Sequence, residues 1–327
     1  MELSRMGRLG VLTTAVILAF TGCGGAGTGT RGAVVPQGIT PTLRATHDKS
    51  WMTVKANFHH PWLYVSDTAN SVVYIYDLGK TGISLIGKIT DGLNGPFGLA
   101  VDSSGNLYVS NQGTPGNVVV YAAGQTSPSL TLSDGLTTPQ GVSVDSSGNV
   151  WVMNRSDSPG IDVFPPRDTE PSEYITNPLI QNPIQDFFDR EGNLFFSDPI
   201  TGVSEIPAGS SQQPVPLNLR GLNHADGITL APSAHLYVGD WRGNKDYVTH
   251  VYAQGSTQPR YDLEGNVASY YLANGTIGYK DVIFAPDWWS DRVFLYKDDS
   301  KKWFSVIDAP GNNDQMGGVA YKPANIP

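Results

Sequence analysis

One phrase recurs along this chain at nearly even spacing, and it constrains the fold more than any other feature. It reads PFGLAVDSSGNLYVSN at 96–111, PQGVSVDSSGNVWVMN at 139–154 and PIQDFFDREGNLFFSD at 183–198, with a looser copy, ADGITLAPSAHLYVGD, at 225–240. The second apolar runs start at residues 107, 150, 194 and 236, so the steps are 43, 44 and 42 residues. A repeat of about 40–45 residues made of short strands is typical of a β-propeller, with one blade per repeat.

Each copy has the pattern of a β-hairpin, with an apolar run, a polar turn and a second apolar run. Three copies share the spelling D-x-x-G-N in the turn, at 102–106, 145–149 and 189–193. Asp bonds the backbone ahead of it, and Gly and Asn adopt the positive φ that such turns need. The alternating acidic residues and the final Glu of an EF-hand are missing. The motif therefore predicts a turn rather than a calcium loop.

The predicted architecture is an all-β, six-bladed propeller. Second strands of blades are indicated near six positions, Leu63, Leu107, Val150, Leu194, Leu236 and Val293. The first of them has no matching strand before it, whereas 315–323 is such a strand without a hairpin partner. We therefore expect Val319 and Tyr321 to lie beside Leu63–Val65, which closes the ring and leaves no open sheet edge. A ring of this size folds as one domain, expected over 61–327.

The N-terminus predicts a lipoprotein signal peptide over residues 1–22. Arg5 and Arg8 precede an apolar run at 9–20 that is short for a membrane span. The sequence FTGC, ending at Cys23, resembles a bacterial lipobox with Phe in place of the usual Leu, and Cys23 is the only cysteine. We expect acyl chains on Cys23 to anchor the protein stably in a bilayer. The alternative is an ordinary secretory signal with an incidental cysteine.

The expected location is the cell envelope, outside the cytoplasm. The residue after Cys23 is Gly24 rather than Asp, which favours the outer membrane if the cell has one. Residues 23–60 are expected to form a flexible tether, because they are rich in Gly, Thr and Pro and lack periodicity. The G-x-G-x-x-G spelling at 27–32 follows no strand and precedes no helix, so it does not indicate a dinucleotide site. The net charge of −9 argues against nucleic acid as a partner.

The blade phrase P-x-G-[LV]-x-V-D-x-x-G-N-[LV]-[YW]-V at 96–109 and 139–152 resembles that of NHL-repeat and gluconolactonase/regucalcin-like six-bladed propellers. The resemblance covers roughly residues 60–327. It implies the fold and leaves the function open, because this architecture hosts binders, scaffolds, hydrolases and lyases.

Candidate site residues come from the face on which the innermost strands begin, the usual ligand site of a propeller. The aligned copies place at its rim Phe97, Gln140, Ile184, Asp226, Lys280 and Gly317, and just inside them Gly98, Gly141, Gln185, Gly227, Asp281 and Gly318. The regular blades use Gly at the inner position, where strands crowd near the axis. Gln185 and Asp281 break that rule, and with Asp226, Lys280 and the nearby His224 they are predicted to form a polar ligand site.

The ends of the second strands carry Asp or Asn in five blades, at Asp67, Asn111, Asn154, Asp198 and Asp240. Such oxygens can hold a hard cation, but each can also cap the turn that follows it. Because all these blades share the feature, turn capping is the favoured interpretation.

Two enzyme families that use this fold bear on Asp226 and His224. Asp226 in HADG is similar to a metal-binding Asp of regucalcin-like lactonases, which implies calcium, but the family's other ligands have no motif match here. Virginiamycin lyase-like propellers resemble the blade phrase too, and they use a His and a Glu on this face. His224 is near, and no Glu is.

The insertion before blade six and the hairpin after it carry aromatic residues. Tyr270, Tyr271 and Tyr279 are expected to roof the polar site, with a longer outer hairpin as the alternative. Trp288 and Trp289 are expected on the opposite face, as a partner surface or a cover of the ring.

We therefore expect a membrane-tethered binding or scaffold module for a protein or small-molecule ligand. The alternative is a metal-dependent hydrolase of the lactonase kind, or a lyase, that uses the channel face.

Overall fold

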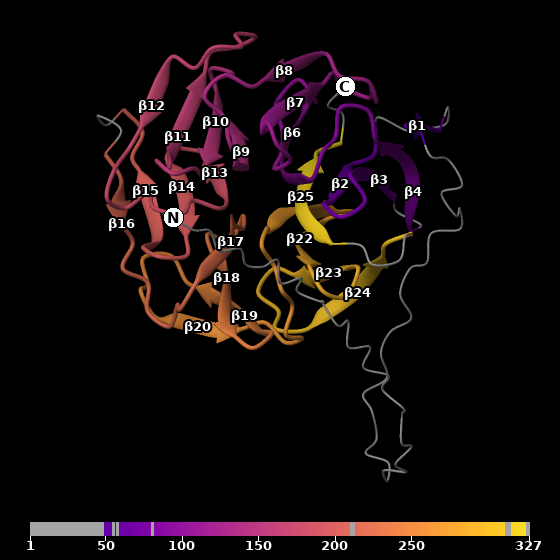
Figure 1. The fold of residues 1–327 in the computed structure, drawn as a ribbon. Helices are drawn as coiled ribbons and strands as arrows, with labels where there is room; N and C mark the ends of the chain where they lie inside the picture. Colours follow the sequence, from indigo (N-terminus) through magenta and orange to yellow (C-terminus); the bar gives the residue numbers. More distant parts are fainter. Residues whose placement is uncertain are drawn as a thin grey trace, which may run out of the picture. The chain divides into compact units, whose positions relative to one another are not determined.

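The computed structural model describes residues 49–53, 56, 59–79, 82–209, 213–310 and 315–324. Six antiparallel sheets are arranged as blades around an axis, as the repeat predicts (Figure 1). The predicted signal peptide, Cys23 and most of the predicted tether lie outside the described residues. Within the part that the structure describes, no helix is long and apolar enough to cross a bilayer.

Blades one to three run from the innermost strand outward in the order of the chain, apart from the innermost and outermost strands of blade one. Blade one has the order β25 (Met316–Lys322), β2 (Trp62–Asp67), β3 (Val72–Gly79), β4 (Gly82–Ile89) and β1 (Trp51–Met52). Blade two has β5 (Pro96–Val101), β6 (Leu107–Asn111), β7 (Asn117–Tyr121) and β8 (Leu130–Leu132). Blade three has β9 (Pro139–Val144), β10 (Val150–Asn154), β11 (Gly160–Phe164) and β12 (Glu173–Ile175).

Blades four to six follow the same plan of four strands each. Blade four has β13 (Asp186–Phe188), β14 (Leu194–Asp198), β15 (Gly202–Ile206) and β16 (Val215–Pro216). Blade five has β17 (Ala225–Leu230), β18 (Leu236–Gly243), β19 (Asp246–Tyr252) and β20 (Pro259–Asp262). Blade six has β21 (Ala273–Ile277), β22 (Lys280–Asp287), β23 (Arg292–Lys297) and β24 (Trp303–Asp308).

The predicted ring closure is confirmed. β25 pairs antiparallel with β2, with Val65 opposite Val319 and Leu63 opposite Tyr321. At the other edge of this blade, Trp51 and Met52 pair with β4, so the expected tether ends earlier than residue 60. The reason is that β4 is eight residues long and still offers backbone groups at its outer edge.

The D-x-x-G-N segments are turns, as predicted. In blade two, Asp102 Oδ1 accepts hydrogen bonds from the backbone N–H groups of Ser104 and Asn106, and its Oδ2 accepts one from the Asn106 amide at 2.8 Å. The glycines have positive φ, 82° at Gly105 and 87° at Gly148, which a side chain would strain. These turns define one face of the ring, called here the hairpin face. The opposite face, on which the innermost strands begin, is called the mouth face.

Neighbouring blades approach each other most closely beside the axis. A Cβ atom added to Gly318 would lie 2.0 Å from the carbonyl oxygen of Phe97 in the next blade, which explains the repeated glycine. Serines of second strands join the same blades: Ser66 donates to the Phe97 carbonyl at 2.7 Å, and Ser110 donates to that of Gln140. The innermost strands are therefore held together by backbone contacts that leave little room for side chains.

The predicted alignment of blade six is wrong. Its innermost strand is β21, and residues Lys280 and Asp281 begin the second strand after a tight turn in which Ile277 pairs with Lys280. Val293 therefore lies in the third strand, and Lys280 and Asp281 lie on the hairpin face. The misalignment arises because this turn has Gly278 and Tyr279 in place of the D-x-x-G-N spelling.

Candidate binding site at the mouth of the channel

Blade six contributes aromatic residues to the mouth face instead of the predicted charges. The Trp288 N–H donates to the carbonyl of Ala268, as the Gln112 N–H does to that of Gly95 in blade two. This equivalence aligns Tyr270 with Phe97 and Tyr271 with Gly98. The rim is therefore made of Phe97, Gln140, Ile184, Asp226, Tyr270 and Gly317.

Tyr271 fills the channel just below the mouth. Its side chain is buried, with 1% of the residue exposed, and its hydroxyl donates to the carbonyl of Gln140 at 3.1 Å. Phe97 and Ile184 pack against it, and the rings of Phe97 and Tyr271 meet edge to face at 5.5 Å. Burial raises the pKa of Tyr271 well above its usual value, so the hydroxyl stays protonated. Tyr271 therefore closes the channel rather than roofing a polar site.

The side-chain amide of Gln185 links the backbones of two other blades by hydrogen bonds and is not available to a ligand. Its Oε1 accepts hydrogen bonds from the backbone N–H of Ile228 at 2.7 Å and of Leu272 at 2.9 Å. Its Nε2 donates to the carbonyl of Leu272 at 2.7 Å. The amide thus satisfies backbone groups of blades five and six that have no ladder partner at this point. This explains why Gln185 breaks the glycine rule.

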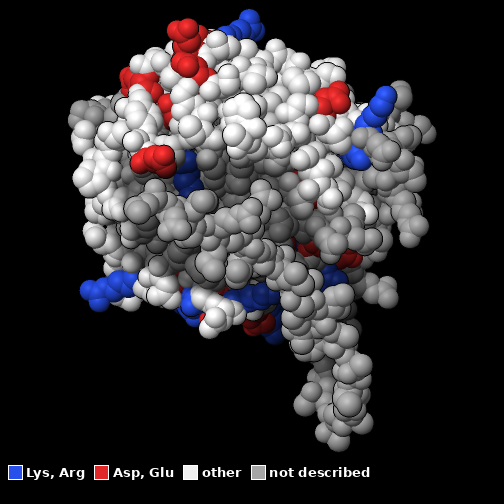
Figure 2. Space-filling view, viewed as in Figure 1, with Lys and Arg blue, Asp and Glu red and all other residues white. Residues whose placement is uncertain are grey.

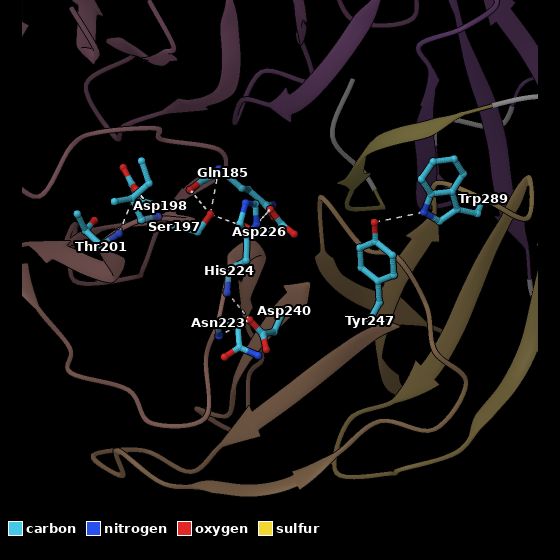
Figure 3. A network of polar contacts seen from close by, with 11 residues as sticks. Gln185, Ser197, Asp198, Thr201, Asn223, His224, Asp226, Asp240, Tyr247 and Trp289 are labelled. Carbon is cyan, nitrogen blue, oxygen red and sulfur yellow. Dashed lines mark hydrogen bonds and ion pairs between the residues drawn. The ribbon is translucent and has the colours of Figure 1, made fainter. Parts of the chain in front are cut away.

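His224 and Asp226 are the predicted site residues that do meet at the mouth (Figure 3). His224 Nδ1 lies 3.0 Å from Asp226 Oδ1. The side chain of Asp226 is 2% exposed and that of His224 is 32% exposed, so the ring reaches solvent while its partner is buried. The hydrogen bond with Asp226 raises the pKa of His224 above its ordinary value. Trp241 holds the ring edge to face at 5.1 Å.

A second layer of charges supports the loop of His224. Asp240 Oδ1 accepts the backbone N–H groups of Asn223 and His224, each at 2.7 Å. The buried His250 lies behind it, with Nε2 3.6 Å from Asp240 Oδ2 and Nδ1 2.6 Å from Asp262 Oδ1. Burial alone would lower the pKa of His250, but Asp240 and Asp262 outweigh it and raise this pKa. His250 therefore links the ionisation of the interior to the position of the His224 loop.

The Asp and Asn residues at the ends of second strands cap loops, which is the favoured interpretation from the sequence. Asn111 Oδ1 accepts the backbone N–H of Asn94 at 3.1 Å, and Asp67 Oδ1 accepts that of Asn70 at 3.0 Å. Asp198 Oδ2 accepts the N–H groups of Gln181 and Asn182. Most of these loops lead into the innermost strand of the same blade. Sequence analysis identified the capping but expected it in the following turn.

A cavity of about 300 Å³ lies at the mouth, and sequence analysis placed Phe97, Gln140, Ile184 and Tyr270 there but not the rest of its lining. Trp288 lies here because the turn between β22 and β23 is on the mouth face, so its predicted placement is wrong. Its ring meets those of Tyr270 and Phe97 at 5.3 and 6.0 Å. By contrast, Tyr279 is 98% exposed on the hairpin face and roofs nothing.

The polar side of the cavity comes from blades two and three. It is lined by Gln112, Thr138, Gln140 and Arg155. Gln112 Nε2 donates to Gln140 Oε1 at 2.8 Å, which orients both amides. Arg155 is exposed, and no hydrogen bond or ion pair of its side chain occurs among the described residues. The sequence held one signal for Gln112 and Arg155. Each directly follows the second strand of its blade, and the residue at this position varies from blade to blade.

The oxygen groups of Asp226, Gln185 and Asp281 do not converge on a cation site. Asp226 bonds to His224, both atoms of the Gln185 amide are occupied, and Asp281 lies on the hairpin face. Over the described ranges of the chain, no three His, Cys, Asp or Glu side chains are grouped so that they could hold a metal ion.

Comparison with known proteins does not assign the chain to a family. No protein-family model matches the chain, and no curated protein matches it significantly. The six-bladed propeller is therefore established by the structure, and kinship with NHL-repeat or gluconolactonase-like proteins rests on the blade phrase alone.

The charge of His250 predicts a pH dependence of stability. A raised folded-state pKa means that the protonated ring stabilises the fold below the unfolded-state pKa of about 6.5, and that this contribution disappears as pH rises through the folded-state pKa. We expect the free energy of unfolding, measured with urea, to fall above about pH 6.5. His250→Asn should remove part of that fall, and other groups with a raised pKa, His224 and Asp186, contribute to the rest. His235→Asn, the same change in the turn before β18, should keep the full slope; equal slopes in all three proteins would contradict the assignment.

Proposed function

We propose that this protein is a binding module whose ligand is held at the mouth of the channel. The observation that carries the proposal is a cavity lined by three aromatic rings and by Arg155, whose guanidinium has no hydrogen bond or ion pair among the described residues. The closed channel below it, filled by Tyr271, restricts a ligand to the mouth. Such a site suits a small molecule, or the end of a longer one, that has a flat apolar part and an anionic group.

The chemistry of the lining supports this class of ligand. A guanidinium binds carboxylate or phosphate through two parallel hydrogen bonds. Phe97, Tyr270 and Trp288 provide apolar surface beside Arg155, and the Gln112–Gln140 pair supplies further donors and acceptors. The cavity of about 300 Å³ matches the smaller ligand sites of proteins. Figure 2 shows charged side chains in small separate groups on the visible surface, which favours a local site over a broad electrostatic one.

The proposal predicts selectivity for anionic aromatic compounds. We expect phenylacetate to bind the purified protein more tightly than the neutral phenylacetamide in isothermal titration calorimetry. Arg155→Gln should weaken phenylacetate at least about tenfold, because a hydrogen bond to a charged group is worth about 1.5–3 kcal/mol. The matched control is Arg167→Gln, which removes the same charge on the hairpin face. Equal affinity for the two compounds, or for the two variants, would refute the assignment of Arg155.

A second candidate function follows from the pairing of His224 with Asp226. A buried carboxylate that holds one nitrogen of a solvent-accessible imidazole leaves the other nitrogen oriented for acid–base chemistry. No hydrogen bond to His224 Nε2 occurs among the described residues. This arrangement favours a hydrolase or a lyase that acts at the mouth.

The enzyme alternative is tested with an aromatic lactone such as dihydrocoumarin. If His224 is a general base, hydrolysis should be faster than in buffer and should increase with pH as the ring loses its proton. His224→Gln should lower the rate at least about 100-fold, while His235→Gln on the hairpin face should not. A rate equal to that of buffer would leave the binding module as the function.

We further propose that the propeller works outside the cytoplasm, attached to a membrane through Cys23. The lipobox-like FTGC and the absence of any other cysteine support this location. Cys23→Ser should move the protein from the membrane fraction to the soluble fraction of lysed cells and abolish incorporation of labelled fatty acid. A conservative change such as Thr21→Ser should alter neither, and labelling that persists in Cys23→Ser would contradict the proposal.

A further inference from the structure

A second and larger cavity, of about 960 Å³, lies on the hairpin face between blades four and five. Its walls include Phe187, Phe195, Leu217 and Leu230, and its charged groups include Asp189 and Glu205. Several of the apolar residues packed here are only partly buried, among them Phe187, Phe195 and Leu217. The reason for this opening is visible in a comparison of the six blades.

In each blade, one row of three cross-strand neighbours faces the next blade. Five blades have a small residue on the innermost strand, an aromatic residue on the second and an aliphatic residue on the third. The third-strand members are Ile75, Val120, Val163, Val251 and Leu295. In blade four the same row is Phe187, Phe195 and Glu205. Blade four therefore replaces the apolar residue that would fill the interface with a carboxylate.

Glu205 has no partner for that carboxylate. Among the described residues, none forms a hydrogen bond or ion pair with its side chain. Burial, and then the charge of Asp189, raise the pKa of Glu205. A carboxylate in such surroundings is stabilised by a cation that enters the cavity.

Asp189 also lacks a donor that its counterparts have. In blade two, the Tyr108 hydroxyl donates to Asp102 Oδ2 at 3.1 Å, and in blade three Trp151 Nε1 donates to Asp145 Oδ2 at 3.1 Å. The equivalent residue of blade four is Phe195, which has no donor. Among the described residues, the side chain of Asp189 accepts hydrogen bonds from Asn193 alone, both at 2.8 Å. One acceptor position on the cavity side of Asp189 is therefore left open.

The apolar wall beside these carboxylates is flat. The rings of Phe187 and Phe195 stack with centroids 5.2 Å apart and planes 9° apart. The volume of the cavity falls within the range of small-molecule sites, which is about 300–1,000 Å³. Macromolecular partners are less suited to it than a compact molecule that enters between the blades.

We propose that the cavity between blades four and five binds a small amphipathic cation. Its ammonium or guanidinium group lies between Asp189 and Glu205, where it supplies the donor that Phe195 lacks, and its apolar body packs on the Phe187–Phe195 pair. This site differs from the mouth in face, in charge and in ligand class, so it does not depend on the proposed function. Arg190, at the rim, is the one internal cation of the lining that competes for the carboxylates.

The test compares 4-phenylbutylamine, charged at neutral pH, with 4-phenylbutan-1-ol, which has the same apolar body and no charge. With the full chain in isothermal titration calorimetry, we expect the amine to bind at least about tenfold more tightly. Glu205→Gln should remove that preference. Glu170→Gln, the same change on a distant turn, should leave it intact. Equal affinities for the two compounds, or no binding of the amine at millimolar concentration, would overturn the proposal.

Two further variants separate loss of binding from loss of folding. Phe195→Tyr should restore a donor to Asp189 and weaken the amine, while thermal unfolding shows that the fold is kept. Glu205→Val, which restores the residue type of the other blades, should raise the melting temperature and abolish binding of the amine. If the amine bound as tightly to Glu205→Val as to the wild type, the site would lie elsewhere. Arg155→Gln, a variant of the mouth, should leave amine binding unchanged.

Discussion

The structure depends on how closely the innermost strands of neighbouring blades approach around the axis. At the glycines of the inner position, the backbone of one blade contacts the backbone of the next, and serines of the second strands bridge the same gap. A Cβ at Gly98 would lie 2.2 Å from the carbonyl oxygen of Gln140, so a side chain is excluded wherever this contact is kept. The sixfold arrangement is therefore fixed by sterics close to the axis, and residues farther out can vary.

Function is then expected where blades depart from this rule. Two side chains occupy the inner position, Gln185 and Tyr271, and both complete the interior: one brackets backbone groups and the other closes the channel. Two other departures leave a charged side chain without a hydrogen bond or ion pair among the described residues: Arg155 on the mouth face and Glu205 on the hairpin face. A residue that departs from the repeat and provides hydrogen bonds to nearby backbone groups serves the fold. A departure that leaves a charged side chain without a partner indicates a ligand.

Much of the fold could be predicted from the sequence, because alignment of the repeat copies shows which residues are equivalent in different blades. Blade number, turn chemistry and the pairing of Val319 with Val65 all follow from comparing copies of one phrase. The prediction failed in blade six, where the turn at Gly278 and Tyr279 lacks the common spelling and a strand-like run shifted the alignment. That error placed Lys280, Asp281 and Trp288 on the wrong faces, and it gave Tyr271 the role of a roof when its side chain fills the channel. Side-chain pairing across blades, such as that of Gln185 with Leu272, is set by tertiary geometry that one sequence does not reveal.

The pairing of β25 with β2 has a consequence for biogenesis. Ser66 and Gly318 meet across 252 residues of chain, so this edge of β2 has no partner until β25 has been synthesised. A strand edge that stays unpaired for this time can pair with other chains. Pairing of β2 with β25 is slow because it closes a long loop of chain, which costs conformational entropy. If the chain crosses a membrane as it is made, the nascent protein needs protection at this edge. A chaperone that covers β2 until the last strand arrives would provide it.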